Sequence, residues 1–99
     1  DMEHDNPVKA EDFLLRAASL LQERGKEYDK DGGERSMTKT VQAFNLITGH
    51  ELVEAEGWLL LQLLKDARQW SKPQFHRDSA EDSVSYAALK SEALARAAG

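Results

Sequence analysis

The sequence contains no cysteine, and this absence excludes disulfide bonds, thiolate zinc sites and cysteine nucleophiles. It also lacks any apolar run close to the roughly 20 residues that a membrane-spanning helix needs. No basic segment followed by an apolar one opens the chain, so a secretory leader is not expected. Together these absences indicate a cytoplasmic protein without a membrane partner.

Basic residues are fewer than acidic ones, 13 against 18, which gives a formal net charge of −5 at pH 7. A protein that binds nucleic acid by neutralising phosphates needs a basic face. The charge of this chain therefore argues against DNA or RNA as a partner.

The 99 residues are expected to form one helical domain, residues 1–99, with a modest hydrophobic core. Residues 1–6 are expected to be disordered or to derive from expression, because Asp1-Met2 has the form of a remnant placed before the natural initiator. The segment 29–35 combines Asp, Lys, Gly, Glu and Arg, breaks the apolar spacing and predicts a flexible loop.

Two helices are expected before residue 50. The first follows Asp5-Asn6-Pro7, where a capping residue and an early proline precede apolar residues at helical spacing. The second is capped by Ser36 or Thr38, and Gly49 ends it, as a glycine just past a helix commonly does.

The third helix is expected over residues 52–70. Its run from Trp58 to Leu64 is apolar nearly all round, and such a helix is buried on most sides. Pro73 ends it, and a fourth helix starts at Asp78 or Ser79. The sequence therefore predicts an all-α four-helix bundle. Because one small bundle cannot cover so apolar a helix, we also expect a homodimer.

Polar residues in the second half of the chain recur with helical spacing. Asp78, Asp82 and Tyr86 follow one another at every fourth residue, so they form one stripe on a helix. Lys65 and Arg68 lie about 60° apart around an ideal helix and therefore share a face of the third helix. The pattern is compatible with a metal–phosphate site or with ion pairs between the third and fourth helices.

These residues resemble a family of small phage and prophage proteins, over about residues 10–95 of this chain. The resemblance lies in Arg24-x-x-x-Tyr28, the acidic Glu56, Lys65-x-x-Arg68 and the stretch His76-x-Asp78-x-x-x-Asp82-x-x-x-Tyr86. That family is in turn similar to the MazG-type all-α nucleotide pyrophosphohydrolases in helical layout and acidic spacing. Those enzymes cleave nucleoside triphosphates to monophosphate and pyrophosphate, with magnesium held by Glu-x-x-Glu and Glu-x-x-Asp motifs on neighbouring helices.

The resemblance implies a MazG-like fold, a cytoplasmic location in a bacterial host and a magnesium-dependent nucleotide site. Glu51-x-x-Glu54 has the spacing of the first acidic motif, whereas Asp78-x-x-Glu81 has the residue types of the second motif reversed. The magnesium ligands that the resemblance implies are Glu54, Glu56, Asp78 and Asp82. The candidate nucleotide-binding residues are Lys65 and Arg68, whose charges suit a triphosphate, and Tyr86, whose ring suits stacking on a base.

The same residues can also be explained by structural roles alone. Ser79-x-x-Asp82 has a spacing like that of a capping box, and acidic residues gather in first turns because of the helix dipole. Lys65 and Arg68 are suited to ion pairs with Asp78 or Asp82 across the helix interface. A tyrosine such as Tyr86 commonly packs its ring while its hydroxyl finds a partner.

Two functions remain open at this point. One is a phage-type accessory protein that binds, or hydrolyses, a nucleoside triphosphate with magnesium. The other is a non-catalytic module that binds a host or phage protein. The enzyme needs at least three carboxylates converging beside Lys65 or Arg68, whereas the binding module predicts carboxylates engaged in caps and ion pairs, with an exposed apolar patch elsewhere.

Overall fold

The computed structural model describes residues 7–30 and 36–99. It contains four helices in those ranges: α2 (Ala10–Lys30), α3 (Ser36–Thr48), α4 (Glu54–Trp70) and α5 (Arg77–Ala98). No strand occurs within the same ranges, so the expectation of an all-α bundle is confirmed. None of these helices combines the length and the hydropathy that crossing a membrane requires.

The two segments for which disorder or a loop was expected fall largely outside the described ranges. Residues 1–6 and 31–35 lie outside them, and α2 extends through residues 29 and 30, the first two positions of the expected loop.

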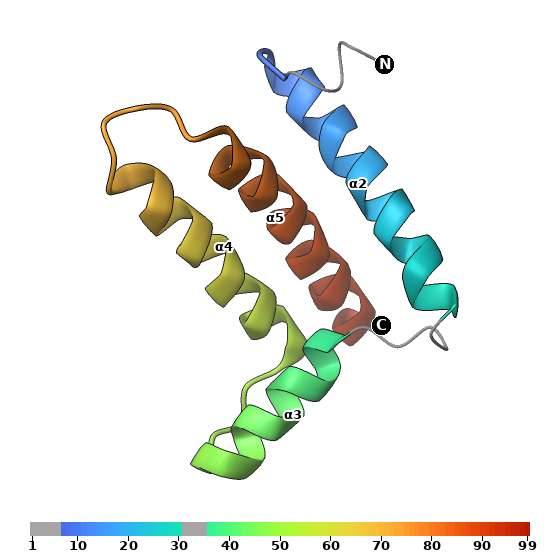
Figure 1. Ribbon diagram of the computed structural model, residues 1–99. Helices are drawn as coiled ribbons and strands as arrows, with labels where there is room; N and C mark the ends of the chain where they lie inside the picture. Colours follow the sequence, from blue (N-terminus) through green and yellow to red (C-terminus); the bar gives the residue numbers. More distant parts are fainter. Residues whose placement is uncertain (1–6, 31–35) are drawn as a thin grey trace.

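The helix α5 lies between two neighbours. Figure 1 shows α2, α5 and α4 side by side, with α3 crossing near the start of α4. The packing follows this order: α4 contacts α5 most extensively, α2 contacts α5, and α3 contacts α4. Among the described residues, no Cα atom of α2 lies within 8 Å of one in α4, and none of α3 lies within 8 Å of one in α2 or α5. The bundle is therefore open, built on the α4–α5 hairpin.

The ends of α3 and α4 follow from local hydrogen bonding. Gly49 adopts a left-handed φ of 76° just after α3, and its N–H donates to the Asn45 carbonyl at 2.8 Å. The Asn45 side chain then bonds both the N–H and the carbonyl of Leu52, each at 2.9 Å, and so holds the connection to α4. At the start of α4, the Val53 N–H donates to Glu56 Oε1 at 2.8 Å.

The small core is formed mainly where α3, α4 and α5 meet, and its buried members are Met37, Val41, Ala55, Trp58, Leu89 and Ala93. Gly57 allows α3 to approach α4 closely. A Cβ at this position would overlap Met37 Sδ and lie 2.9 Å from Val41 Cγ2. The absence of a side chain at Gly57 therefore determines how closely these two helices pack.

The helix α4 is less buried within the chain than its composition suggested. Leu59, Leu60, Leu63 and Leu64 are between 39% and 56% exposed, and Trp70 is 86% exposed. The expectation that this helix is buried on most sides is therefore wrong for the single chain. α5 covers one side of α4 and α3 covers part of another, which leaves the remaining side open.

Candidate functional site

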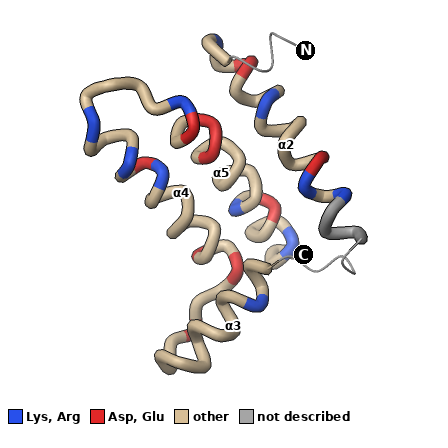
Figure 2. Tube along the Cα trace, viewed as in Figure 1, with Lys and Arg blue, Asp and Glu red and all other residues tan. Residues whose placement is uncertain are grey.

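Lys65 and two aspartates form a compact charged cluster at one end of the α4–α5 hairpin. Lys65 Nζ lies 2.8 Å from Asp82 Oδ2 and 3.6 Å from Asp78 Oδ2. The Lys65 and Asp82 side chains are only 12% and 16% exposed, whereas Asp78 is 73% exposed. Figure 2 shows the acidic start of α5 beside the basic residues of α4. The predicted ion pair between the third and fourth helices is thus present at Lys65.

The environment of Lys65 favours its charged form. The hydrogen bond to Asp82 raises the pKa of Lys65 above its ordinary value of 10.5; burial opposes this, while the negative charges of Asp82 and Asp78 add to it. Lys65 is therefore a cation neutralised by carboxylates of its own chain.

Glu54 and Glu56, at the start of α4, are engaged at the opposite end of the hairpin. Glu54 Oε2 accepts a hydrogen bond from Trp58 Nε1 at 3.1 Å and lies 3.6 Å from Arg96 Nη2 near the end of α5. Glu56 caps the first turn of α4 through the Val53 N–H. Both carboxylates, which the resemblance implied to be magnesium ligands, thus have structural roles instead.

The four carboxylates proposed as magnesium ligands do not converge within one chain. Glu54 lies beside Arg96, and Arg96 follows Asp82 by 14 residues along α5. At 1.5 Å per residue, the two ends are about 21 Å apart, far beyond the span of a single ion. No group of three or more His, Asp or Glu residues suited to a metal ion occurs among the described residues.

The starting residues of α5 do not form the expected capping box. Ser79 Oγ pairs with His76 Nδ1, while Asp82 pairs with Lys65. The His76 N–H donates to Gln69 Oε1 at 2.8 Å, and Gln69 Nε2 donates to the Gln74 carbonyl at 2.9 Å. The side chain of Gln69 therefore holds the turn that joins α4 to α5.

Arg68 and Tyr86 have different environments. Arg68 is exposed and makes no ion pair with any residue in the described ranges, so the ion pair expected for it is not found there. Tyr86 is partly buried and stacks on Trp58, with ring centroids 6.0 Å apart and an interplanar angle of 25°. The Tyr86 ring thus belongs to the packing between α4 and α5.

A second buried charge was not anticipated from the sequence. Glu81 is only 9% exposed, and its carboxylate lies 3.4 Å from Arg16 Nε of α2 and 3.9 Å from Arg77 Nη1. Arg77 Nη1 also donates to the Pro7 carbonyl at 2.9 Å. The four-residue spacing of Arg77 and Glu81 predicts an ion pair between them on one helix. The contact of Glu81 with Arg16 could not be predicted in this way, because it joins positions 65 residues apart.

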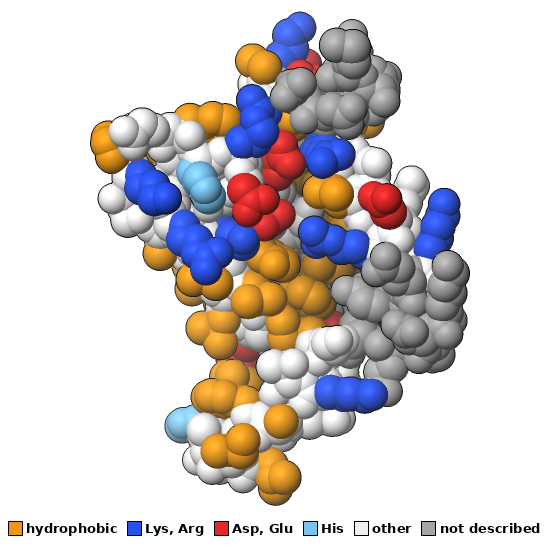
Figure 3. All heavy atoms as spheres, viewed as in Figure 1, with side chains coloured by type: hydrophobic (Ala, Val, Ile, Leu, Met, Phe, Trp, Pro, Cys, Tyr) orange, Lys and Arg blue, Asp and Glu red, His pale blue; other side chains and the backbone are white. Residues whose placement is uncertain are grey.

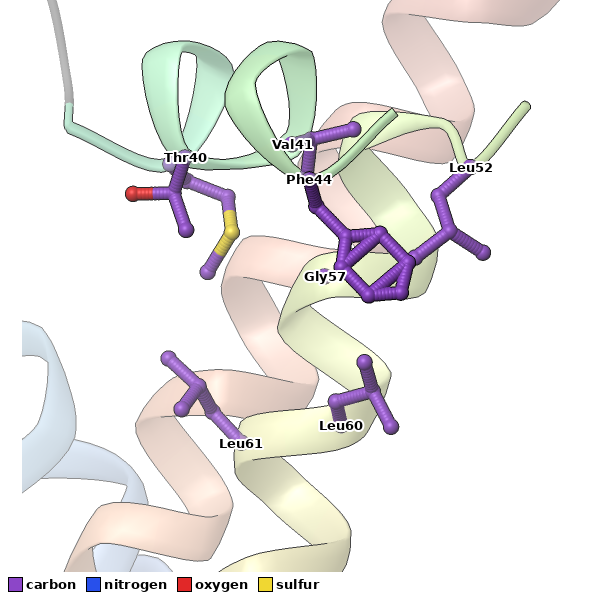
Figure 4. Close-up of a pocket in the computed structure, with 8 residues that line it drawn as sticks. Thr40, Val41, Phe44, Leu52, Gly57, Leu60 and Leu61 are labelled. Atoms are coloured by element: carbon purple, nitrogen blue, oxygen red, sulfur yellow. The ribbon is translucent and has the colours of Figure 1, made fainter. Parts of the chain in front are cut away.

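The apolar surface of α4 continues into a hollow beside α3. The hollow has a volume of about 140 Å³, similar to a cavity that holds benzene. Figure 4 shows its lining residues coming from α3, α4 and the segment that joins them; they are Met37, Thr40, Val41, Phe44, Leu52, Gly57, Leu60 and Leu61. On the face drawn in Figure 3, hydrophobic side chains likewise extend below the charged cluster and onto α3.

No protein-family model matches the chain, and neither a curated protein nor a solved structure is significantly similar to it.

Proposed function

We propose that this protein is a helical protein-binding module whose contact surface is the open apolar side of α4 with the adjoining part of α3. One contrast carries the proposal: leucines and Trp70 of α4 are exposed, whereas Glu54, Glu56 and Asp82 are engaged in ion pairs or a helix cap. Monomeric proteins rarely leave a contiguous apolar surface unless it binds something.

The shape of this surface supports a helical partner. Leu60 belongs both to the open side of α4 and to the hollow beside α3, so the hollow adjoins the surface. An amphipathic helix binds such a surface by laying its apolar residues along it and inserting one side chain into a pocket. The apolar lining of the hollow suits an aliphatic or aromatic side chain of the partner.

A nucleotide site has less support from the same residues. Lys65 would have to exchange its 2.8 Å contact with Asp82 for a phosphate. A phosphate near Lys65 would also meet the negative charges of Asp78 and Asp82, unless magnesium neutralised them. Of the implied nucleotide-binding residues, Arg68 alone is an exposed cation without an ion pair in the described ranges.

The proposal is tested by thermal unfolding with common nucleoside triphosphates, with and without magnesium. A nucleotide at 100 times its dissociation constant adds about 2.7 kcal/mol, which corresponds to a midpoint roughly 10–20 °C higher for a chain of this size. We expect no magnesium-dependent rise.

A rise that needs magnesium and disappears in Asp82→Asn would overturn the protein-binding proposal in favour of the nucleotide site. Glu23→Gln, which removes an exposed carboxylate of α2, controls for the loss of one negative charge.

A further inference from the structure

Met37 holds α3 on α4 and also lines the hollow between these two helices. Met37 and Val41 are the two buried residues of α3, and both side chains pack on α4 at Gly57. The Met37 side chain also lines the hollow, and so does Leu60, which is 56% exposed. The hollow therefore reaches the protein surface, and a small solute can approach Met37 through it although that residue is only 8% exposed.

The surroundings of Met37 do not suit a polar group on its sulfur atom. Thr40 is the lining residue of the hollow with a polar side chain, and its Oγ1 already donates to the Ser36 carbonyl at 2.8 Å. On the side of α4, Gly57 leaves so little room that even a Cβ there would overlap Met37 Sδ. An oxygen atom added to the sulfur would therefore lie against hydrocarbon or push α3 away from α4.

We propose that Met37 is an oxidation site through which a peroxide weakens the packing of α3 on α4. With hydrogen peroxide, a lone pair of Met37 Sδ attacks one oxygen atom and the O–O bond breaks. The other oxygen atom takes up the proton and leaves as water. The thioether is oxidised to a sulfoxide and the peroxide is reduced, which turns a flexible apolar side chain into a polar one. Because a buried polar group without a hydrogen-bond partner costs free energy, α3 detaches more readily.

The α4–α5 hairpin should be affected less than α3, because its main contacts do not involve Met37. Trp58 stacks on Tyr86 and Lys65 pairs with Asp82 whether or not α3 is in place. A polar sulfur would also make the hollow less suitable for an apolar side chain of a partner. That last consequence alone rests on the proposed protein-binding function.

Hydrogen peroxide applied to two variants with a single methionine tests the proposal. The chain contains two methionines, so Met2→Leu leaves only Met37 and Met37→Leu leaves only Met2. Leucine is close to methionine in volume and keeps the core packed at position 37. After peroxide, Met2→Leu should gain one oxygen atom in the mass spectrum, and amide exchange in α3 should become about fivefold faster or more. Met37→Leu should gain its oxygen at Met2 and keep the exchange in α3 unchanged.

Reduction of the sulfoxide gives a second readout. Methionine sulfoxide reductase with a dithiol should return the slow exchange of α3, since the oxygen leaves as water while the two thiols form a disulfide. Met37 that stays reduced in the folded chain, under conditions that fully oxidise Met2, would overturn the access through the hollow. Complete oxidation of Met37 with unchanged exchange in α3 would overturn its effect on packing. Both measurements use the chain without a partner, so the protein-binding function is decided separately.

Discussion

Replacing Lys65 by methionine should destabilise the fold by about 2 kcal/mol. The change keeps most of the side-chain volume but removes the cation that pairs with Asp82 and Asp78. A hydrogen bond between charged groups contributes about 1.5–3 kcal/mol, and breaking a fully buried pair costs about 3–5 kcal/mol. Because Lys65 and Asp82 remain 12% and 16% exposed, water offsets part of the loss. The expected fall in melting temperature is roughly 8–16 °C.

The pH dependence of this effect has a definite sign. The folded-state pKa of Lys65 is above 10.5, so the folded chain holds the proton more tightly than the unfolded chain. The stabilisation is therefore complete below about pH 10.5 and is lost as pH rises through the folded-state pKa. Urea unfolding at increasing pH should show the difference between wild type and Lys65→Met shrinking above pH 10.5.

Lys90→Met is the matched control for this experiment. Lys90 Nζ donates to Gln62 Oε1 at 2.9 Å across the same α4–α5 interface, but its partner is neutral. Its replacement should cost less than that of Lys65, because only one of the two hydrogen-bonded groups carries a charge. An unchanged or raised melting temperature in Lys65→Met would refute the structural role and favour a lysine held in place for a ligand.

Two further predictions concern packing and the helical turn. Gly57→Ala should destabilise the fold by about 1–2 kcal/mol in urea unfolding, because the clash with Val41 and Met37 outweighs the helix propensity gained; Gly25→Ala, whose new Cβ would meet no atom within 4 Å, should instead stabilise by up to about 1 kcal/mol. Gln69→Ala should cost about 1–2 kcal/mol and speed amide exchange at the His76 N–H, which loses its acceptor. Unchanged exchange at His76 would contradict that role.

The helices could be predicted from the sequence because their ends depend on neighbouring residues. Gly49 ends α3 through its own left-handed conformation, and Pro73 follows the end of α4 within three residues. The start of α5 was placed one or two residues late, at Asp78 or Ser79, whereas the helix begins at Arg77 and His76 occupies the position before it. Such errors arise because several polar residues in succession can serve as caps.

The candidate site was less predictable, because it depends on which helix ends meet. The ion pair of Lys65 with Asp82 follows from a short turn between two helices, which places the end of one beside the start of the next. The same turn sends the helices in opposite directions, so Glu54 at the start of α4 cannot lie near Asp82 at the start of α5. The spacing of acidic residues along the sequence does not show that the two helices run in opposite directions.

Contacts between residues far apart in the sequence could not be predicted, for a related reason. The contact of Arg16 with Glu81 exists because α2 packs on α5 rather than on α4. Amphipathic spacing shows that α2 has an apolar side but not which helix covers it. Likewise, the apolar run of α4 indicated a buried helix, while the open side that remains depends on how α2 and α3 are placed.

The packing of α2 and α3 on different helices of the α4–α5 hairpin has a consequence for folding. The hairpin of α4 and α5 closes a turn of only a few residues, so its formation costs little loop entropy. α3 packs mainly on α4 and α2 mainly on α5, while Leu21 of α2 also packs against the core that α3, α4 and α5 share. The hairpin can thus act as a nucleus that forms first and opens last, with the two flanking helices added to it.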